Sequence, residues 1–513
     1  MERLATIRTR RHPGPVKLVD QGRLFVVHGR LESVTCDVAV VVTDDSGLLG
    51  QHWSDVAGPR NEPLDMTRGW ATVPLTTDPG APIVLAVSIE TTYDEVLRRL
   101  DAVLRETVRA VTLPTRGAMS PPLVAMPVVG IGAGGFSERR GDVVRALVDH
   151  LSSACPEIGV DVALVTPDPA VHAAAQHARR YLPSPVTEEL EDHARRLGAL
   201  ARRGRLAVFM GAGVSIPSGL PSWHELLGTL AKRYSMVDVL AAAGDFSATD
   251  KAGLIEKSSE GGFRRVVAES FSGEHRPSLL HAMVAALDPH EVITTNYDLL
   301  YEEAVEATGR GIASVMPWES ALESDRWILK LHGDVAHPDQ IVLTRHHMVR
   351  YDAVSRPSAS MLQSLLLTRH TLFVGVSMTD DNVLRLMHEV EAYLTANEVE
   401  SAGTFGTVLD VAGDSARARL WADQLTWLDL DSGVLSGTRA VEIFLDRVAL
   451  HASRNSSWLL DERFAGLLEP TDQDLAERAR SLFQLLSSRE SSPWAPLERQ
   501  LRKFGARTVP DDG

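Results

Sequence analysis

Short apolar runs rich in β-branched residues alternate with longer, helix-periodic segments over residues 1–185. Turn-forming residues bound the short runs, as they usually bound strands, and the longer segments repeat apolar positions every three or four residues. Strands are predicted at residues 24–27, 36–42, 123–130 and 161–168, and helices at residues 91–111, 142–151 and 170–182. This alternation predicts an α/β domain with a mostly parallel or mixed sheet.

A second α/β region follows a short linker that contains prolines. The two prolines within residues 182–186 resist both helix and sheet. The charged, helix-prone residues 187–203 then lead into RLAVFM, residues 205–210, whose continuous apolar character is typical of a buried strand. We expect an α/β domain over residues 1–185, a second one over 186–455 and a helical tail over 456–513.

Composition and charge restrict the classes of protein. A chain of 513 residues exceeds what one hydrophobic core usually supports, and a net charge of −16 disfavours non-specific binding to nucleic acid or anionic membranes. The two cysteines, Cys36 and Cys155, supply neither a disulfide framework nor a cysteine-only zinc site, so no zinc is expected. No stretch approaches the ~20 apolar residues of a spanning helix, and no signal peptide is recognisable. We therefore predict a cytoplasmic protein.

The first chemical motif is a glycine loop that follows residues 205–210 and contains Gly211, Ala212, Gly213 and Ser215. Glycines allow a sharp turn and let backbone N–H groups approach a pyrophosphate, whose charge a helix N-terminus stabilises. The spacing is not GxGxxG, and a plain strand-to-helix turn explains the same residues equally well.

Three polar residues, Thr295, Asn296 and Asp298, form the second motif at the end of a β-branched strand. Open α/β sheets bind ligands at that edge, although an Asx turn without a further role explains the pattern too. His332 follows an apolar strand in the third motif, where an exposed imidazole is suited to act as a general base near neutral pH. A lone histidine at such a place is more often structural.

The fourth motif is GVSMTDDN, in which a buried strand ends at Gly375 and Ser377. Asp380 or Asp381 is placed to cap the next helix, and the serine and the acidic pair are also suited to bind ribose hydroxyls. The order and spacing of the four motifs are more specific than any one of them.

Together the four motifs resemble the sirtuin superfamily, in which a GAGxS loop, an Asn-x-Asp turn, a His-Gly pair and a Gly-x-Ser strand end follow in that order. The resemblance covers roughly residues 188–455 and is closest to the bacterial sirtuin-like branch associated with phage defence. TTNYD, LHG and a late GxSxxDxN element recur in that branch. The resemblance implies a Rossmann-like parallel sheet and NAD⁺ as the substrate.

The resemblance also implies roles for individual residues. Gly211, Ala212, Gly213 and Ser215 would hold the NAD⁺ phosphates, and Ser377 would face the adenosine half. Asn296 would position the nicotinamide ribose and an attacking water, Asp298 would support the ribose, and His332 would be the general base. Trp223 would cover the nicotinamide pocket. The other cofactor-binding candidates are Thr295, Gly375, Asp381 and Asn382.

Two departures from deacetylating sirtuins favour hydrolysis of NAD⁺ over deacylation. The chain cannot supply their four-cysteine zinc module, which helps to build the acyl-peptide cleft. Their GIPDFR segment is replaced by GLPSW, residues 219–223, so its acidic and basic residues are lost. Hydrolysis needs only the dinucleotide, water, Asn296 and His332.

The first region resembles, more loosely, a macro domain, a three-layer α/β module whose family binds ADP-ribose. Residues 24–47 parallel its opening strand–loop–strand, and the glycines at 130, 132, 134 and 135 parallel its late phosphate-binding loop. Arg30 replaces the usual acidic residue, and Thr43, Asp44 and Asp45 replace the asparagine-rich turn. An aspartate pair would repel a phosphate.

The resulting hypothesis is a regulated antiphage effector that hydrolyses NAD⁺ to nicotinamide and ADP-ribose, with an N-terminal domain that senses an ADP-ribose-like nucleotide or restrains the enzyme. We expect a homo-oligomer. The alternatives are an NAD⁺-dependent protein deacylase or ADP-ribosyltransferase, and a non-catalytic nucleotide sensor. A pure sensor would need neither Asn296 nor His332. A Rossmann dehydrogenase fits least, because the glycine spacing and the ribose acid are wrong.

Overall fold

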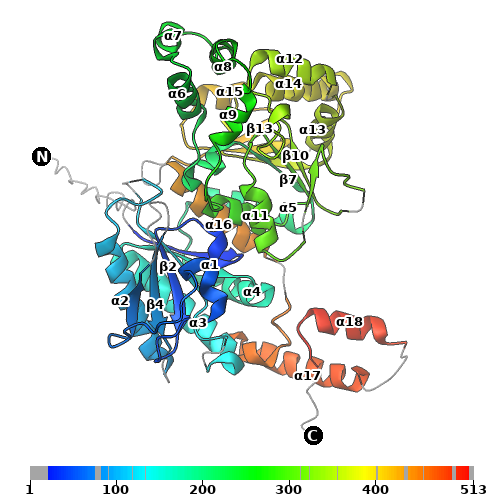
Figure 1. The fold of residues 1–513 in the computed structure, drawn as a ribbon. Helices are drawn as coiled ribbons and strands as arrows, with labels where there is room; N and C mark the ends of the chain where they lie inside the picture. Colours follow the sequence, from blue (N-terminus) through cyan, green and yellow to red (C-terminus); the bar gives the residue numbers. More distant parts are fainter. Residues whose placement is uncertain are drawn as a thin grey trace, which may run out of the picture.

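A computed structural model describes most of the chain, and Figure 1 shows its arrangement. The described residues are 21–74, 82–89, 92–117, 120–132, 135–311, 313–322, 324–354, 356–399, 403–431, 437–453, 456–487 and 493–507. The predicted start of a helix at residue 91, and Gly134 of the glycine cluster, lie outside them. Among these residues, no helix is both long and apolar enough to cross a membrane.

The first sheet has six strands in the order β1-β6-β5-β2-β4-β3, with β3 antiparallel to β4 and the other pairs parallel. The strands are β1 (Leu24–His28), β2 (Val38–Thr43), β3 (Trp70–Val73), β4 (Ile83–Ser88), β5 (Leu123–Pro127) and β6 (Asp161–Thr166). The helices are α1 (Ser54–Ala57), α2 (Tyr93–Ala110), α3 (Arg140–Ile158) and α4 (Pro169–Ala178). The predicted α/β domain with a mostly parallel or mixed sheet is confirmed, but neither β4 nor the edge strand β3 was predicted.

The second sheet has seven parallel strands in the order β13-β12-β11-β7-β8-β10-β9. The strands are β7 (Leu206–Met210), β8 (Glu291–Thr294), β9 (Ser314–Met316), β10 (Trp327–Lys330), β11 (His370–Val374), β12 (Gly406–Asp410) and β13 (Leu425–Asp429). Every residue of β7 is buried, as expected for a strand that helices cover on both faces. The predicted parallel sheet is confirmed.

In the described part of the chain, eleven α-helices precede or connect these strands. They are α5 (Glu188–Arg202), α6 (Trp223–Arg233), α7 (Val237–Ala242), α8 (Ala248–Lys257), α9 (Phe263–Glu269), α10 (Leu279–Ala286), α11 (Leu300–Ala307), α12 (Arg345–Val354), α13 (Arg356–Thr368), α14 (Asp381–Ala396) and α15 (Ser415–Leu420). Helices α13 and α14 cover one face of the second sheet, while α6, α8 and α9 form a separate apolar cluster with Tyr297. This cluster lies beyond the strand ends, where Figure 1 places α6, α7 and α8 at the top.

One hydrophobic core joins the facing sides of the two sheets. It contains Phe25 and Val27 of β1, Val208 and Met210 of β7, and buried residues of the helices between them. Those helices are α5, α10 and α16 (Gly437–Ala452), and Figure 1 shows α16 between the two sheets. The two sheets therefore share a helical layer.

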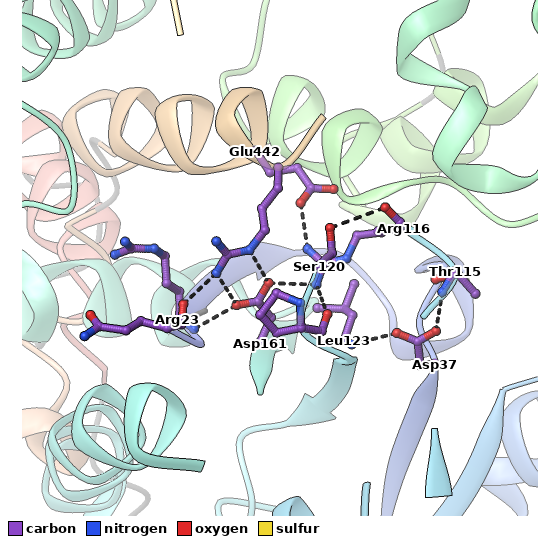
Figure 2. Close-up of polar contacts among 11 residues, drawn as sticks. Arg23, Asp37, Thr115, Arg116, Ser120, Leu123, Asp161 and Glu442 are labelled. Carbon is purple, nitrogen blue, oxygen red and sulfur yellow. Dashed lines mark hydrogen bonds and ion pairs between the residues drawn. The ribbon is translucent and has the colours of Figure 1, made fainter. Parts of the chain in front are cut away.

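Helix α16 carries charged side chains into this shared layer. Arg439 donates two hydrogen bonds to Asp161, at 2.9 Å each, and Asp161 also accepts a bond of 2.7 Å from Arg116. Arg116 reaches back to Glu442 of α16 at 2.7 Å, as Figure 2 shows. Further along the helix, Asp446 pairs with Arg179 at 2.6 Å.

Burial alone would raise the pKa of Asp161, but Arg439 and Arg116 outweigh it and hold that pKa below its ordinary value. The carboxylate is therefore charged at neutral pH. On the opposite side of α16, Arg447 and His451 contact Glu191 of α5 at 2.6 and 2.8 Å. Charge pairs thus fix α16 to both neighbouring units.

The chain after α16 returns to the first sheet. It forms α17 (Pro470–Ser487) and α18 (Ala495–Lys503), preceded by a 3-10 segment over Glu462–Leu467. Trp458, Phe464 and Phe483 are buried in the core on the α2–α3 side of that sheet. The C-terminal residues are thus part of the packing of the N-terminal unit.

Replacing Asp161 by Asn should lower the free energy of unfolding by about 3–5 kcal/mol, because it removes the carboxylate partner of the buried Arg439 and leaves the buried Arg116 with Glu442 alone. Chemical denaturation of the full chain measures the change. Asp192→Asn is the matched control, since its partner Arg195 is 54% exposed and the pair is a surface one. Equal midpoints for the two variants would contradict a structural role for the buried pairs.

Candidate functional site at the carboxyl ends of β7, β8, β10 and β11

The candidate site lies where the strand order of the second sheet reverses. The chain passes from β7 to β8 on one side and returns through β11 on the other side of β7. Open α/β sheets bind ligands outside the carboxyl ends of the strands at such a switch point. All four predicted motifs follow strands that end at this edge, namely β7, β8, β10 and β11.

The loop after β7 packs directly on the loop after β11. The N–H groups of Gly211 and Gly213 donate to the carbonyls of Val374 and Gly375, both at 3.0 Å. A Cβ on Gly213 would lie 2.8 Å from Gly375 Cα, and one on Gly211 would lie 2.6 Å from Gly375 O. Gly375 itself has φ of +65°. Glycine is required here because two backbones approach each other closely.

Most N–H groups of the glycine loop are already bonded within the protein. Besides Gly211 and Gly213, Val214 donates to Gly211 O at 3.1 Å and Ser215 donates to Ala212 O at 3.0 Å. Within residues 211–215 of the described chain, the Ala212 N–H is the group left for a phosphate. Fewer backbone N–H groups of this loop are therefore free to bind a ligand than the sequence suggested.

Asn296 is held in one orientation by two acceptors. Its Nδ2 donates to Gly211 O at 3.1 Å and to Ser215 Oγ at 3.0 Å. A carbonyl oxygen can only accept, so Nδ2 must face Gly211 and Oδ1 must face away. The side chain is 8% exposed, and Oδ1 is buried without a hydrogen-bond partner among the described residues. Because a buried unpaired acceptor is costly, Oδ1 is placed to accept a hydrogen bond from a ligand or water.

Ser215 and Asp298 belong to the same hydrogen-bonded group. Ser215 Oγ donates to Asp298 Oδ2 at 2.8 Å, and Asp298 Oδ1 accepts from the N–H of Leu300 at 3.1 Å. The second contact is the Asx-type turn that the sequence left open as an alternative. Lys330 binds the Asp298 carbonyl and pairs with Glu302 at 2.7 Å. Asp298 therefore orients the loop and Ser215.

A pocket opens beside this group. Its lining combines polar residues of the β7 and β8 loops with apolar residues of the segment around α6: Ala212, Ser215, Leu220, Pro221, Trp223, Leu226, Phe271, Thr295, Asn296, Tyr297 and Asp298. Trp223 stands at the start of α6, whose first turn is fixed by a capping box between Ser222 and Glu225. The structure thus brings predicted residues of the first and second motifs and Trp223 to one cavity.

His332 lies on the neighbouring strand end, outside that lining. Lys330 pairs with Thr294 in the register of β10 and β8, so His332 and Asn296 each follow two residues later on adjacent parallel strands. His332 Nε2 contacts Asp380 Oδ2 at 3.3 Å. Burial lowers the pKa of His332, with Asp380 opposing the shift. The imidazole is therefore neutral at pH 7 and has a lone pair available for a proton.

The polar residues of the fourth motif make different contacts. Asp380 caps α14 by accepting from the N–H groups of Asn382 and Val383, at 3.0 and 3.2 Å. Asp381 is exposed and lies 3.8 Å from Arg345, and Ser377 Oγ contacts Thr379 at 2.7 Å. Of the two aspartates considered from the sequence, Asp380 is the one that contacts His332.

Sequence reasoning missed His281 and Ser278 of the buried group. His281 Nε2 lies 3.3 Å from Ser215 Oγ, and its Nδ1 accepts the Ser278 N–H at 3.0 Å. Ser278 Oγ donates to Val214 O at 2.8 Å. Both residues belong to the start of α10 and lie outside the four motifs, and the signal in the sequence was an N-cap serine followed three residues later by a polar side chain.

Part of this region is similar to a known protein family. Residues 290–424 match the SIR2-like domain family. The chain carries a SIR2-like domain. The matched segment includes Asn296, Asp298, His332 and the fourth motif, whereas the glycine loop lies before it.

Three curated relatives are similar to part of the chain. The NAD(+) hydrolase ThsA of Bacillus cereus (strain MSX-D12) is 30% identical over 196 residues, which are 36% of this chain and 40% of the relative. A protein of the same name from Enterococcus faecium is 28% identical over 220 residues, covering 40% of this chain and 44% of the relative. Defense-associated sirtuin 2 of Bacillus subtilis is 28% identical over 200 residues, or 37% of this chain and 20% of the relative. The chain thus matches less than half the length of each.

Gly213→Ala should destabilise the unit that contains the second sheet by about 1–3 kcal/mol, because the added methyl group forces two packed backbones apart. Gly228→Ala is the matched control: a Cβ there meets nothing within 4 Å, and alanine favours a helix by about 0.5–1 kcal/mol. Denaturation midpoints of the two variants should therefore move in opposite directions. Movement in the same direction would contradict this account of the glycine loop.

Stability should fall as the pH drops from 7 to 5. Burial lowers the pKa of His281 to about 4, whereas the unfolded chain binds that proton near 6.5, so the unfolded state gains protons first. In His281→Asn this contribution is absent. The stability difference between wild type and variant should therefore shrink toward pH 5 in denaturant titrations, and a constant difference would show that His281 is not buried as a neutral group.

Proposed function

We propose that the SIR2-like domain hydrolyses NAD⁺ to nicotinamide and ADP-ribose. The observation that carries this proposal is the buried, unpartnered Oδ1 of Asn296, whose direction Gly211 and Ser215 determine. An acceptor fixed in that way suits a ribose hydroxyl or a water molecule beside it. The names of the relatives, two NAD(+) hydrolases and a defence-associated sirtuin, support the same substrate and a role in defence.

The chemistry needs a positioned water and a proton acceptor. In the proposed reaction the water oxygen bonds to C1′ of the ribose while the bond from C1′ to the nicotinamide nitrogen breaks, and nicotinamide leaves as a neutral molecule with the electron pair. The water proton passes to neutral His332, which Asp380 orients through Nε2. Asn296 Oδ1 holds the water or the ribose in line, which is the positioning that such a reaction requires.

The remaining predicted residues receive proposed roles from their surroundings. We assign the pyrophosphate to the Ala212 N–H and the nicotinamide to the apolar part of the pocket beside Trp223. Ser215 and Asp298 act as positioning residues, since hydrogen bonds within the protein already engage Ser215 Oγ and both Asp298 carboxylate oxygens. Ser377, which is exposed after β11, remains the candidate for the adenosine half.

We further propose that the N-terminal unit is a macro-like regulatory domain. Its mixed sheet has helices on both faces, which suits a three-layer module, and a glycine turn follows β5. Gly130 and Gly135 in that turn have φ of +94° and +84°. Because the unit shares the layer of α16 with the SIR2-like domain, a change in one is placed to affect the other.

Wild-type protein incubated with NAD⁺ should release nicotinamide and ADP-ribose in equal amounts, measured by chromatography. Asn296→Ala and His332→Ala should each reduce kcat at least about 100-fold, the usual contribution of a positioned general base or of substrate orientation. Asn397→Ala and His346→Ala are matched controls, because both side chains are exposed and neither lines the pocket.

Wild type that binds NAD⁺ without turning it over would contradict hydrolysis and support the nucleotide sensor. Release of nicotinamide that depends on an acylated peptide would instead support a deacylase. Deletion of residues 1–185 is a poor test of regulation, because it would leave Arg439, Glu442 and Asp446 of α16 without their partners.

A further inference from the structure

The N-terminal unit touches the chain just before α10. Thr35, which lies between β1 and β2, donates its N–H to Pro277 O at 2.8 Å and its Oγ1 to Arg276 O at 2.6 Å. The next residue, Ser278, is the N-cap of α10. One threonine of the N-terminal unit therefore holds both carbonyls that precede this helix.

Apolar packing strengthens the same connection. Leu279, Leu280 and Met283 of α10 are buried in the core that also contains Phe25 and Val27 of β1. Helix α10 is therefore positioned by the first sheet as well as by its own domain. Its location relative to the glycine loop depends on the N-terminal unit.

The start of α10 also sets the direction of the hydrogen bonds at the candidate site. The Ser278 N–H donates to His281 Nδ1 at 3.0 Å, so in the neutral ring the proton resides on Nε2. His281 Nε2 then donates to Ser215 Oγ at 3.3 Å, and the serine proton points to Asp298 Oδ2 at 2.8 Å. His281 is 1% exposed, and burial keeps it neutral.

This arrangement leaves Ser215 Oγ as an acceptor for Asn296. The serine oxygen receives hydrogen bonds from His281 Nε2 and Asn296 Nδ2 and donates one to Asp298, which satisfies it fully. Asn296 Nδ2 is thereby retained on the protein side, and Oδ1 remains directed away from it. A displacement of α10 would remove the His281 donor and free the serine to rotate.

We propose that Thr35 and His281 are positioning residues for the reaction, and that the N-terminal unit sets the catalytic rate by holding α10 where His281 orients Ser215 and, through it, Asn296. The inference rests on the proposed NAD⁺ hydrolysis. We expect Thr35 and His281 to affect kcat and not KM, because neither residue lines the pocket.

Two substitutions of His281 separate its two hydrogen bonds. His281→Asn retains an acceptor for the Ser278 N–H but has no group at the position of Nε2, so kcat for NAD⁺ should fall about tenfold with KM nearly unchanged. His281→Gln places an amide N–H near the Nε2 position, and it should recover much of that loss. A purely structural role would lower the melting temperature of both variants without separating their kcat values.

Thr35→Val and Thr35→Ser test the contact between the units in the full-length protein. Valine keeps the backbone N–H bond and loses the Oγ1 bond, so kcat should fall about threefold, while serine should retain the wild-type rate. In the double variant with His281→Asn, Thr35→Val should reduce kcat little further, because both substitutions act through the same contact between α10 and Ser215.

Three outcomes would overturn the inference while hydrolysis stands: His281→Asn with wild-type kcat, His281→Gln no better than His281→Asn, or Thr35→Val reducing kcat by the same factor in both backgrounds. Wild type without turnover would overturn the proposed function and this inference with it. Active wild type with the predicted order of variants would establish both.

Discussion

The buried helix α16 is the constraint on which the arrangement of this protein depends. Its charged side chains pair with Asp161 and Arg116 of the first unit and with Glu191 of the second, inside a buried layer. Such pairs add little net stability over apolar packing, but a misplaced helix would leave several charges buried alone. The network therefore specifies one relative placement of the two sheets.

Helix α10 connects this shared layer with the candidate site. The same layer that holds α16 holds α10 against β1, and the first turn of α10 supplies Ser278 and His281 to the buried polar group. A site built only from the second sheet would lack this contact. The N-terminal unit consequently contacts the chain just before the helix whose first turn reaches Ser215.

The sequence predicted much of the fold, because parallel strands buried on both faces and amphipathic helices have strong periodic signals. It also indicated that the four motifs meet at one edge of the second sheet, since Gly211, Asn296, His332 and Gly375 all follow apolar strands. It did not reveal why the glycines are required, which is the contact of the loops after β7 and β11. Nor did it distinguish Asp380 from Asp381, because the two differ in which way each faces.

By itself the sequence determined the two α/β regions, the kinds of side chain at the strand ends and the SIR2-like character of residues 290–424. Only the tertiary structure decided the packing of the C-terminal helices on the first sheet, the burial of α16 and the contact of Thr35 with the chain before α10. The physical reason is the range of each signal. Periodicity and turn chemistry are local, whereas these contacts join residues separated by up to hundreds of positions and depend on where two sheets come to rest.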